Sequence, residues 1–466
     1  MSQSGMMAAL MGLLLAVASA GGQDAHAGRA KPNIVFIMID TLRSDHVGCY
    51  GYKRKTTPNI DRFAEEGVRF AQMVSASGWT KPSLMTMFTS LPPTLHGATK
   101  ARNKLRDGVT TLAAELRKTG YQTMGFCSNP TANGKFGFSR GFDVYDDFTI
   151  PLACDLNLFQ DFDDEQRIQA IETAPHVNRL AFRWLEKKRK EGKFFLFLLY
   201  LDPHADYSPP APYDTMFDPD YEGFADGTSA YPGRTKGKLT DRDKEHVVAL
   251  YDGEIRYTDE HVGRLLQKLD DLRLVEDTVV LIIGDHGEEF WDHGRTLHGH
   301  SLYEELTRVP WLLRYPRRLT AGTVVKEQVC HADVMPTLLE LAGLPVPAQC
   351  RGQSLVKRLT ENRHLDWQCA FLETETREKI QAVRVPGRKL LLRPDSGVKE
   401  LYDLTADPHE RVNLIDSAPD WAAGLMSRFD RWRTHVRTSE KAMADGGRPE
   451  LDKKTLRHLK GLGYIP

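Results

Sequence analysis

The sequence predicts an α/β protein with a large, mostly parallel central sheet flanked by helices and a small C-terminal antiparallel sheet. Three continuous apolar runs, at residues 33–39, 194–201 and 278–283, have the composition of strands buried on both faces. Helical patterns lie between and after these runs, and strands that alternate with helices are typical of a parallel sheet. Weaker strand patterns follow near residue 360 and predict the second sheet.

The predicted helices separate or follow the apolar runs. They comprise residues 60–66, 110–119, 176–190, 241–269 and 333–341, with a last helix at 419–436. The short strand patterns are residues 370–372, 381–385, 389–393 and 400–404, joined by Gly and Pro turns. Residues 209–237 are rich in Pro, Gly, Tyr and Asp, which predicts a long surface loop and a candidate lid that faces the substrate.

Length and charge limit the classes of protein that fit. The 466 residues suit one large domain with a smaller one, and the net charge of −1 gives no overall field that would attract a nucleic-acid polymer. We therefore expect a main domain at residues 31–355, a C-terminal subdomain at residues 360–466 and no nucleic-acid partner. The sequence does not predict the oligomeric state.

Residues 1–27 have the pattern of a secretory signal peptide. An apolar run at residues 6–18 is followed by two triplets that suit a cleavage site, Ala18-Ser19-Ala20 and Ala25-His26-Ala27. The run is too short for a membrane span, so we expect an exported protein, periplasmic or extracellular, without a transmembrane anchor. Because no Lys or Arg precedes the run, a ragged hydrophobic tail is the alternative.

The six cysteines show no CxxC pair and no zinc-ribbon spacing. An even count in an exported chain permits disulfides, and Cys330 with Cys350 is the first pair to test. Free buried cysteines are the alternative.

Polar residues that can bind metal follow each of the buried strands. Asp40 follows the first, Asp202 the second, and Asp285 with His286 the third. Open α/β sheets place their sites beyond the carboxyl ends of the strands, so these side chains are expected to meet in one crevice. Oxygen and imidazole ligands together suit Zn, Mn, Ca or Mg. The alternative for the third strand end is a turn with a capping Asp.

Thr80 precedes a second candidate feature, a helix at residues 85–89 with Pro82 suited to its first turn. A hydroxyl at the positive end of a helix and near a cation can attack phosphorus or sulfur. The alternative is that Thr80 is an ordinary N-cap.

A series of short motifs runs through residues 31–415. They are Pro32-Asn33-Ile34-Val35-Phe36-Ile37-Met38-Ile39-Asp40-Thr41-Leu42-Arg43, Gly48-Cys49-Tyr50-Gly51, Thr57-Pro58-Asn59-Ile60-Asp61, Glu66-Gly67-Val68-Arg69-Phe70, Thr80-Lys81-Pro82-Ser83, Gly141-Phe142-Asp143, Asp202-Pro203-His204, Gly284-Asp285-His286-Gly287-Glu288, Leu302-Tyr303-Glu304-Glu305, Glu400-Leu401-Tyr402-Asp403-Leu404 and Asp407-Pro408. In this order the motifs resemble those of the sulfatase family, which belongs to the alkaline phosphatase superfamily. The resemblance covers most of residues 31–415 and implies an alkaline phosphatase-like fold and metal-dependent ester hydrolysis.

The resemblance also implies which residues bind the metal. Asp40, Asp285 and His286 would hold one divalent ion, with the nucleophile Thr80 as a further ligand. Thr41 stands where many sulfatases have a second Asp.

Other residues are implied to contact the substrate. His204 and His298 fall where the family places residues that contact the transferring group or protonate the leaving oxygen, and His300 is a rival for the second role. Asn129 lies near a substrate-contact position of the family. A second metal site formed by Asp202, His204 and His298 is the alternative to a single metal.

The chain departs from the family at the nucleophile. Sulfatases that hydrolyse sulfate esters usually carry Cys at the Thr80 position, oxidised to formylglycine, and Arg at the Leu84 position. We therefore expect no formylglycine. Members with a Thr or Ser nucleophile mostly handle phosphoryl groups, which favours phosphomonoesters, phosphodiesters or phosphonates of a small molecule, glycan or lipid. The alternatives are a genuine sulfuric ester hydrolase with an unmodified Thr, a phosphoryl-group transferase and a catalytically silent protein that binds polyanions.

Overall fold

The computed structural model describes residues 31–147 and 173–461, apart from residues 232, 234, 236, 366, 367, 418, 444 and 445. The predicted signal peptide at residues 1–27 and the sixth cysteine, Cys154, lie outside the described residues. Within the described part of the chain, no helix combines the length and the apolar composition that crossing a bilayer requires.

The centre of the molecule is a nine-stranded sheet in the order β11-β2-β10-β6-β1-β5-β3-β4, with β9 paired to β2. Strand β1 (Asn33–Ile39) lies between β5 (Phe194–Tyr200) and β6 (Thr278–Gly284) and is parallel to both. All residues of these strands are buried, as expected from their continuous apolar sequences. The predicted α/β fold with a mostly parallel central sheet is confirmed.

The rest of this sheet consists of strands that the sequence patterns do not single out. On one side, β3 (Gln122–Cys127) and β4 (Val144–Asp146) continue the parallel order beyond β5. On the other side, β10 (Trp311–Arg314) runs antiparallel to β6 and to β2 (Val68–Val74), and β11 (Thr323–Cys330) is parallel to β2.

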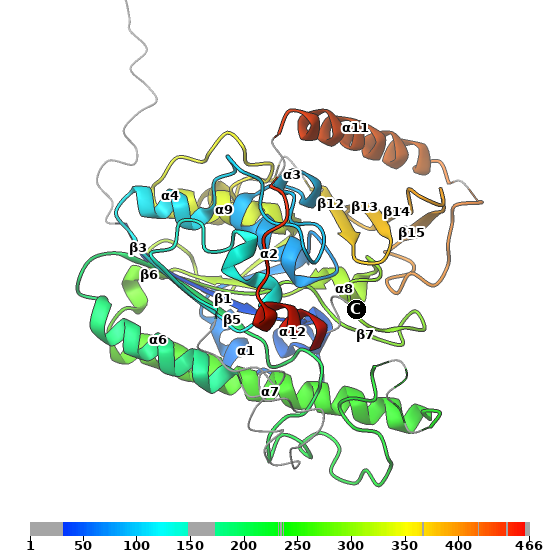
Figure 1. Cartoon of the computed structure of the whole chain (residues 1–466), viewed down its shortest axis with the longest axis horizontal. Helices are drawn as coiled ribbons and strands as arrows, with labels where there is room; N and C mark the ends of the chain where they lie inside the picture. Colours follow the sequence, from blue (N-terminus) through cyan, green and yellow to red (C-terminus); the bar gives the residue numbers. More distant parts are fainter. Residues whose placement is uncertain are drawn as a thin grey trace, which may run out of the picture.

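Helices cover both faces of the central sheet (Figure 1). On one face lie α1 (Pro58–Glu65), α6 (Ala174–Lys188) and α7 (Asp241–Asp271), whose apolar residues form one core cluster with the sheet. On the other face, α2 (Thr80–Thr89), α4 (Leu112–Lys118) and α9 (Val334–Leu341) share a second cluster with it. The predicted helices are therefore present, with ends that shift by one to a few residues.

The second sheet is the predicted small antiparallel one, in the order β12-β13-β14-β15. Its strands are β12 (Ala370–Glu375), β13 (Lys379–Val385), β14 (Arg388–Leu392) and β15 (Lys399–Asp403). Helix α11 (Ala422–Lys441) packs on it and extends beyond the predicted end. A further helix, α12 (Lys453–Gly461), is not predicted by the sequence patterns.

Short elements complete the described part of the chain. They are α3 (Pro93–His96), α8 (Glu304–Thr307), α10 (Val356–Glu361), β7 (Glu289–Phe290), β8 (Thr296–Leu297) and β9 (Arg308–Val309).

The proposed pairing of Cys330 with Cys350 is wrong, since both residues carry free thiols. The Cys330 side chain accepts the backbone N–H of Asp333, at the start of a short 3₁₀ turn. Cys350 lies in a turn that is held by the backbone bond from its N–H to the Pro347 carbonyl, 3.0 Å long. The two residues thus lie in separate local structures.

Candidate active site

The parallel register of the two central strands brings three predicted ligands together. Ile39 of β1 is paired with Gly284 of β6, so the residues that follow, Asp40 and Asp285, leave the sheet side by side. Asp40, Asp285 and His286 are fully buried, and one ligand atom from each lies within 4.8 Å of the others. The convergence expected at the strand ends is therefore present.

Thr80 completes this cluster from the far side of the crevice. It is the first residue of α2, and the residue before it, Trp79, makes no side-chain cap. The Thr80 hydroxyl lies 3.2 Å from His286 Nε2 and 3.4 Å from Asp40 Oδ1. The N-cap alternative is thus wrong: the hydroxyl faces the acidic cluster.

The loop before α2 is fixed to the end of β6. Ser75 donates a hydrogen bond from Oγ to the Asp285 carbonyl (2.7 Å), and Ser83 donates from Oγ to the Ser77 carbonyl (3.1 Å). These bonds fix the start of α2 relative to the strand that carries Asp285. They set the distance between the Thr80 hydroxyl and its neighbours.

One carboxylate oxygen of Asp285 accepts hydrogen bonds and the other does not. Its Oδ1 accepts the backbone N–H groups of Thr41 (3.1 Å) and His286 (2.8 Å). Its Oδ2 is buried and accepts no hydrogen bond from the described residues. A buried carboxylate oxygen without a donor is costly unless it meets a cation.

His286 is prepared as a neutral ligand. Its Nδ1 lies 2.8 Å from the Gly287 carbonyl and must donate to it, so Nε2 carries the lone pair that points at the carboxylates. Burial lowers the pKa of His286 to about 3, which keeps the ring uncharged.

The two carboxyl groups repel each other in this setting. Burial, followed by the charge of Asp285, raises the pKa of Asp40 to about 7, and burial raises the pKa of Asp285 to about 7. A divalent cation would relieve both effects. The Asp, Asp and His donor set fits such an ion but does not select one metal.

Asn129 belongs to the same cluster. It donates from Nδ2 to Asp40 Oδ2 (2.5 Å) and to Thr80 Oγ1 (3.4 Å). Its Oδ1 accepts the N–H and the hydroxyl of Thr131, which fixes the orientation of the amide. The predicted substrate contact therefore lies against the nucleophile candidate.

Two of the predicted histidines flank the cluster. The ring centroids of His298 and His286 are 4.5 Å apart, and those of His298 and His204 are 4.8 Å apart. Glu288 orients His298 through a bond of 2.9 Å to Nδ1. The His204 Nδ1 donates to the Ala205 carbonyl at 2.8 Å.

His300 is placed differently from His298. Its Nε2 lies 2.7 Å from Glu289 Oε2, and its Nδ1 lies 3.3 Å from the His298 carbonyl. Both nitrogens of His300 are thus engaged, and the geometry favours His298 as the residue beside the cluster.

The residue between these histidines links three parts of the chain. Gly299 donates its N–H to the Gly78 carbonyl (2.8 Å), next to α2, and its carbonyl accepts the hydroxyls of Thr374 (3.0 Å) and Thr376 (2.6 Å). Its φ of +84° is in the left-handed region that glycine tolerates best. The small sheet is thus tied to the loop that carries His298.

Two other candidate ligands have different partners. Asp202 accepts the N–H of Ala174 and both the N–H and the hydroxyl of Thr173, and so holds the start of α6. Thr41 donates its hydroxyl to the Pro203 carbonyl (2.9 Å). Both side chains are used in these bonds, and among the described residues Asp202 is not close enough to His204 and His298 to form a group of metal ligands with them.

Sequence reasoning gave no role to Glu288, although it is part of the Asp-His-Gly-Glu motif. Its buried carboxylate orients His298, as described above.

The candidate lid, residues 209–237, contacts this region through the bond of 2.5 Å from the Thr296 hydroxyl to the Ala230 carbonyl. Whether the loop faces the substrate stays a prediction.

Comparison with known proteins gives matches over most of the chain. The family model "Sulfatase" matches residues 32–344, and "N-sulphoglucosamine sulphohydrolase, C-terminal" matches residues 291–428. An arylsulfatase of Clostridium perfringens is 27% identical over 446 residues, covering 83% of this chain and 91% of the relative. An N-acetylglucosamine-6-O-sulfatase of Bacteroides thetaiotaomicron is 25% identical, covering 83% of each protein.

Solved structures share the fold. A protein in complex with its substrate D-glucosamine-2-N,6-O-disulfate has a TM-score of 0.72 at 21% identity, covering 88% of this chain and 99% of that one. The phosphonate monoester hydrolase of Agrobacterium radiobacter has a TM-score of 0.71 at 20% identity, covering 88% and 96%.

Proposed function

Because the chain belongs to the sulfatase family, we propose that it hydrolyses phosphate or sulfate esters through a covalent intermediate on Thr80. The observation that carries this proposal is the position of the Thr80 hydroxyl, 3.2 Å from His286 Nε2 and 3.4 Å from Asp40 Oδ1, in a buried cluster. A threonine with only a capping role would have no reason to face two acids and a histidine.

A divalent cation held by Asp40, Asp285 and His286 would lower the pKa of the Thr80 hydroxyl and offset negative charge on the transferring group. The Thr80 hydroxyl loses its proton to solvent, and its oxygen attacks phosphorus or sulfur in line as the bond to the leaving oxygen breaks. Water then cleaves the ester on Thr80, which releases phosphate, phosphonate or sulfate and restores the hydroxyl. Thr80 is the first residue of α2, and the positive end of a helix favours negative charge on an oxygen placed there.

The remaining residues position the reacting groups and supply a proton to the leaving oxygen. His298, oriented by Glu288, gives a proton to the leaving oxygen, and His204 stabilises charge on the non-bridging oxygens. Burial lowers the pKa of His298, so the ring takes up this proton once the negative charge of the substrate is bound. Asn129 contacts both Asp40 and Thr80 and holds the hydroxyl in place. His300, engaged with Glu289, has a supporting role.

We favour phosphoryl over sulfuryl transfer because a threonine has one hydroxyl. It cannot expel the bound group by re-forming an aldehyde, as a formylglycine hydrate can, so water must cleave the intermediate. The fold accommodates such substrates, since the phosphonate monoester hydrolase of Agrobacterium radiobacter has it too.

Hydrolysis of sulfate esters is the second candidate. The family match and the names of the curated relatives, an arylsulfatase and an N-acetylglucosamine-6-O-sulfatase, favour it. If an acceptor alcohol replaces water, the same site acts as a transferase. A protein that binds polyanions without catalysis is disfavoured. It would not need a buried Asp285 Oδ2 without a hydrogen-bond donor, or the contact between the rings of His204 and His298.

Export is part of the proposal and rests on the signal-peptide pattern at residues 1–27. The substrate would then be a small-molecule, glycan or lipid ester outside the cytoplasm. Secretion of the full-length chain with loss of these residues, measured by intact mass, tests this part.

The experiment that tests the chemistry compares Thr80→Ala with Thr80→Ser on aryl phosphate, aryl phosphonate, bis-aryl phosphate and aryl sulfate. We expect Thr80→Ala to lose at least about 10³-fold in kcat/KM, while Asp40, Asp285 and His286 still hold the metal when it is supplied in excess. Thr80→Ser retains a hydroxyl and keeps measurable turnover. Activity of Thr80→Ala within tenfold of the parent would remove the covalent role, and the order of the four substrates decides between phosphate and sulfate.

A further inference from the structure

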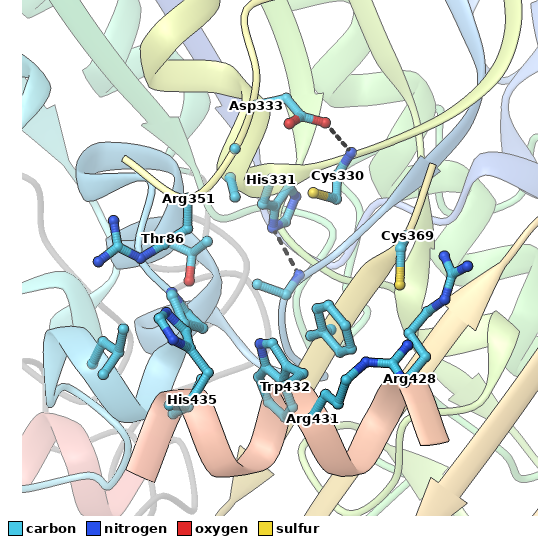
Figure 2. Close-up of a pocket in the computed structure, with 17 residues that line it drawn as sticks. Thr86, Cys330, His331, Asp333, Arg351, Cys369, Arg428, Arg431, Trp432 and His435 are labelled. Atoms are coloured by element: carbon cyan, nitrogen blue, oxygen red, sulfur yellow. Dashed lines mark hydrogen bonds between the residues drawn. The ribbon is translucent and has the colours of Figure 1, made fainter. Parts of the chain in front are cut away.

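A cavity of about 460 Å³ lies between α11 and the end of β11 (Figure 2). None of the cluster residues lines it. Thr86, which does line it, is six residues along α2 from Thr80, or about 9 Å at the rise of an α-helix. The cavity is therefore a separate feature of the molecule, and its volume is in the range of small-molecule sites.

The cavity has an aromatic wall. Phe371 and Trp432 stack with their ring centroids 4.4 Å apart and their planes at 1°. Pro92, Leu95 and Val436 extend this apolar surface. An aliphatic or aromatic body would be removed from water against these side chains.

The cavity also has a positively charged rim. Figure 2 shows Arg428, Arg431 and His435 on α11, opposite the wall that carries His331 and Asp333. Arg431 donates to the Ser427 hydroxyl (2.7 Å).

Arg351 lines the cavity as well and donates to backbone carbonyls, including that of Gln349 (2.8 Å). In the part of the chain that the structure describes, neither Arg351 nor Arg431 forms an ion pair with a carboxylate. Two guanidinium charges at the rim are therefore not balanced by an acid.

The one acid among the lining residues does not balance this charge. Asp333 accepts the backbone N–H groups of Gln353 (2.8 Å) and Cys330 (2.9 Å), the second of which is drawn in Figure 2. Both of its oxygens are thus used inside the wall. Asp333 keeps its negative charge when it accepts backbone N–H groups, but the lining residues include three arginines and only this one acid, so the cavity carries a net positive charge.

We propose that this cavity binds a small amphipathic anion, with an aliphatic or aromatic body and one sulfonate, sulfate, phosphate or carboxylate group. The body packs on Phe371 and Trp432, and the charged group meets the guanidinium groups of Arg428 and Arg431. Charge-assisted hydrogen bonds of this kind are the strong ones and give the cavity its preference for anions.

The wall of the cavity contacts the strand that carries the candidate metal ligands. His331 accepts the N–H of Ala76 at Nδ1 (3.2 Å), so its Nε2 donates to the Gly284 carbonyl (3.1 Å). Gly284 directly precedes Asp285. An anion that binds only the folded protein would raise the Tm of the protein.

The test uses 8-anilinonaphthalene-1-sulfonate and, as a matched neutral probe, N-phenyl-1-naphthylamine, which lacks only the sulfonate. Calorimetry and fluorescence on the full-length protein are expected to show one site for the sulfonate and at least about tenfold weaker binding of the neutral probe. The double variant Arg428→Gln and Arg431→Gln should weaken the sulfonate at least about tenfold and leave the neutral probe unchanged.

The control is the double variant Arg437→Gln and Lys441→Gln, which removes the same charge from exposed positions of α11 that do not line the cavity. It should bind both probes as the parent does, as should Thr80→Ala. Because Arg428 and Arg431 are also exposed and Gln is a good helix former, both double variants are expected to fold. Absence of sulfonate binding to the parent, or equal affinities in the two double variants, would overturn the proposal.

Discussion

Replacing Asp285 with Asn separates the proposed metal role of this residue from a structural one. The amide introduced by Asp285→Asn keeps an oxygen that can accept the N–H groups of Thr41 and His286, which the Oδ1 of Asp285 accepts in the parent. The NH₂ group replaces Oδ2, the atom that has no hydrogen-bond donor in the described structure. The substitution thus removes a charge and a ligand but no hydrogen bond.

The expected effect on stability follows from the pKa of Asp285, which burial raises from 3.8 to about 7. A carboxyl group with a raised pKa binds its proton more tightly in the folded state, so stability falls as pH rises from about 4 to about 7. The full difference corresponds to about 4 kcal/mol above pH 7. Without metal, Asp285→Asn should therefore be roughly 2–4 kcal/mol more stable than the parent near pH 8 and equal to it near pH 4.

The assay is urea unfolding of both proteins in EDTA near pH 4 and pH 8, together with metal analysis of the untreated proteins. Loss of a ligand should weaken metal binding by at least about 100-fold. Asp202→Asn is the control for metal content, because Asp202 is a buried acid that follows β5, the strand on the other side of β1 from β6, but bonds to Thr173 and Ala174. Metal content of Asp285→Asn equal to that of the parent, or lower metal-free stability near pH 8, would refute the reasoning.

Three further predictions follow from the same geometry. His298→Ala should lower kcat by about 10²–10⁴-fold and His300→Ala by less than about tenfold in steady-state kinetics; equal losses would remove the distinction between them. Because the pKa of Asp40 and of Asp285 is raised to about 7, metal affinity measured by titration calorimetry should increase at least about tenfold from pH 6 to pH 8, and a flat profile would speak against these ligands. Gly299→Ala, at a φ of +84°, should cost about 1–2 kcal/mol in urea unfolding and reduce activity; an unchanged midpoint would show that the loop adapts freely.

The sequence predicts the centre of the fold well and its edges poorly. β1, β5 and β6 are continuous apolar runs because both of their faces are buried, and their ends were predicted to within one residue. β2 mixes buried and half-buried residues, and β10 has four residues, so neither gives a clear pattern. Their strand structure comes from pairing with each other and with β6.

The candidate site is predictable in composition and not in detail. Motif order and strand ends identify Asp40, Asp285 and His286, because the register of a parallel sheet brings such residues together. Spacing cannot separate His298 from His300, because the difference lies in which acid each ring contacts, Glu288 or Glu289. These contacts are set by tertiary structure.

The start of α2 shows the same limit. Pro82 led to an expected helix start after Thr80, whereas the helix includes Thr80 as its first residue. The loop before the helix is tied to the residue that follows β6, through the bond from Ser75 Oγ to the Asp285 carbonyl. This long-range bond has no local sequence pattern.

The most direct test of the central claim is mass spectrometry of the protein quenched in acid during turnover of an aryl phosphonate or aryl phosphate. If Thr80 is the nucleophile, the peptide containing Thr80 gains the mass of the transferred group, and fragmentation places this mass on the Thr80 oxygen. Turnover of the substrate with this peptide unmodified, or with the added mass on another residue, would contradict it.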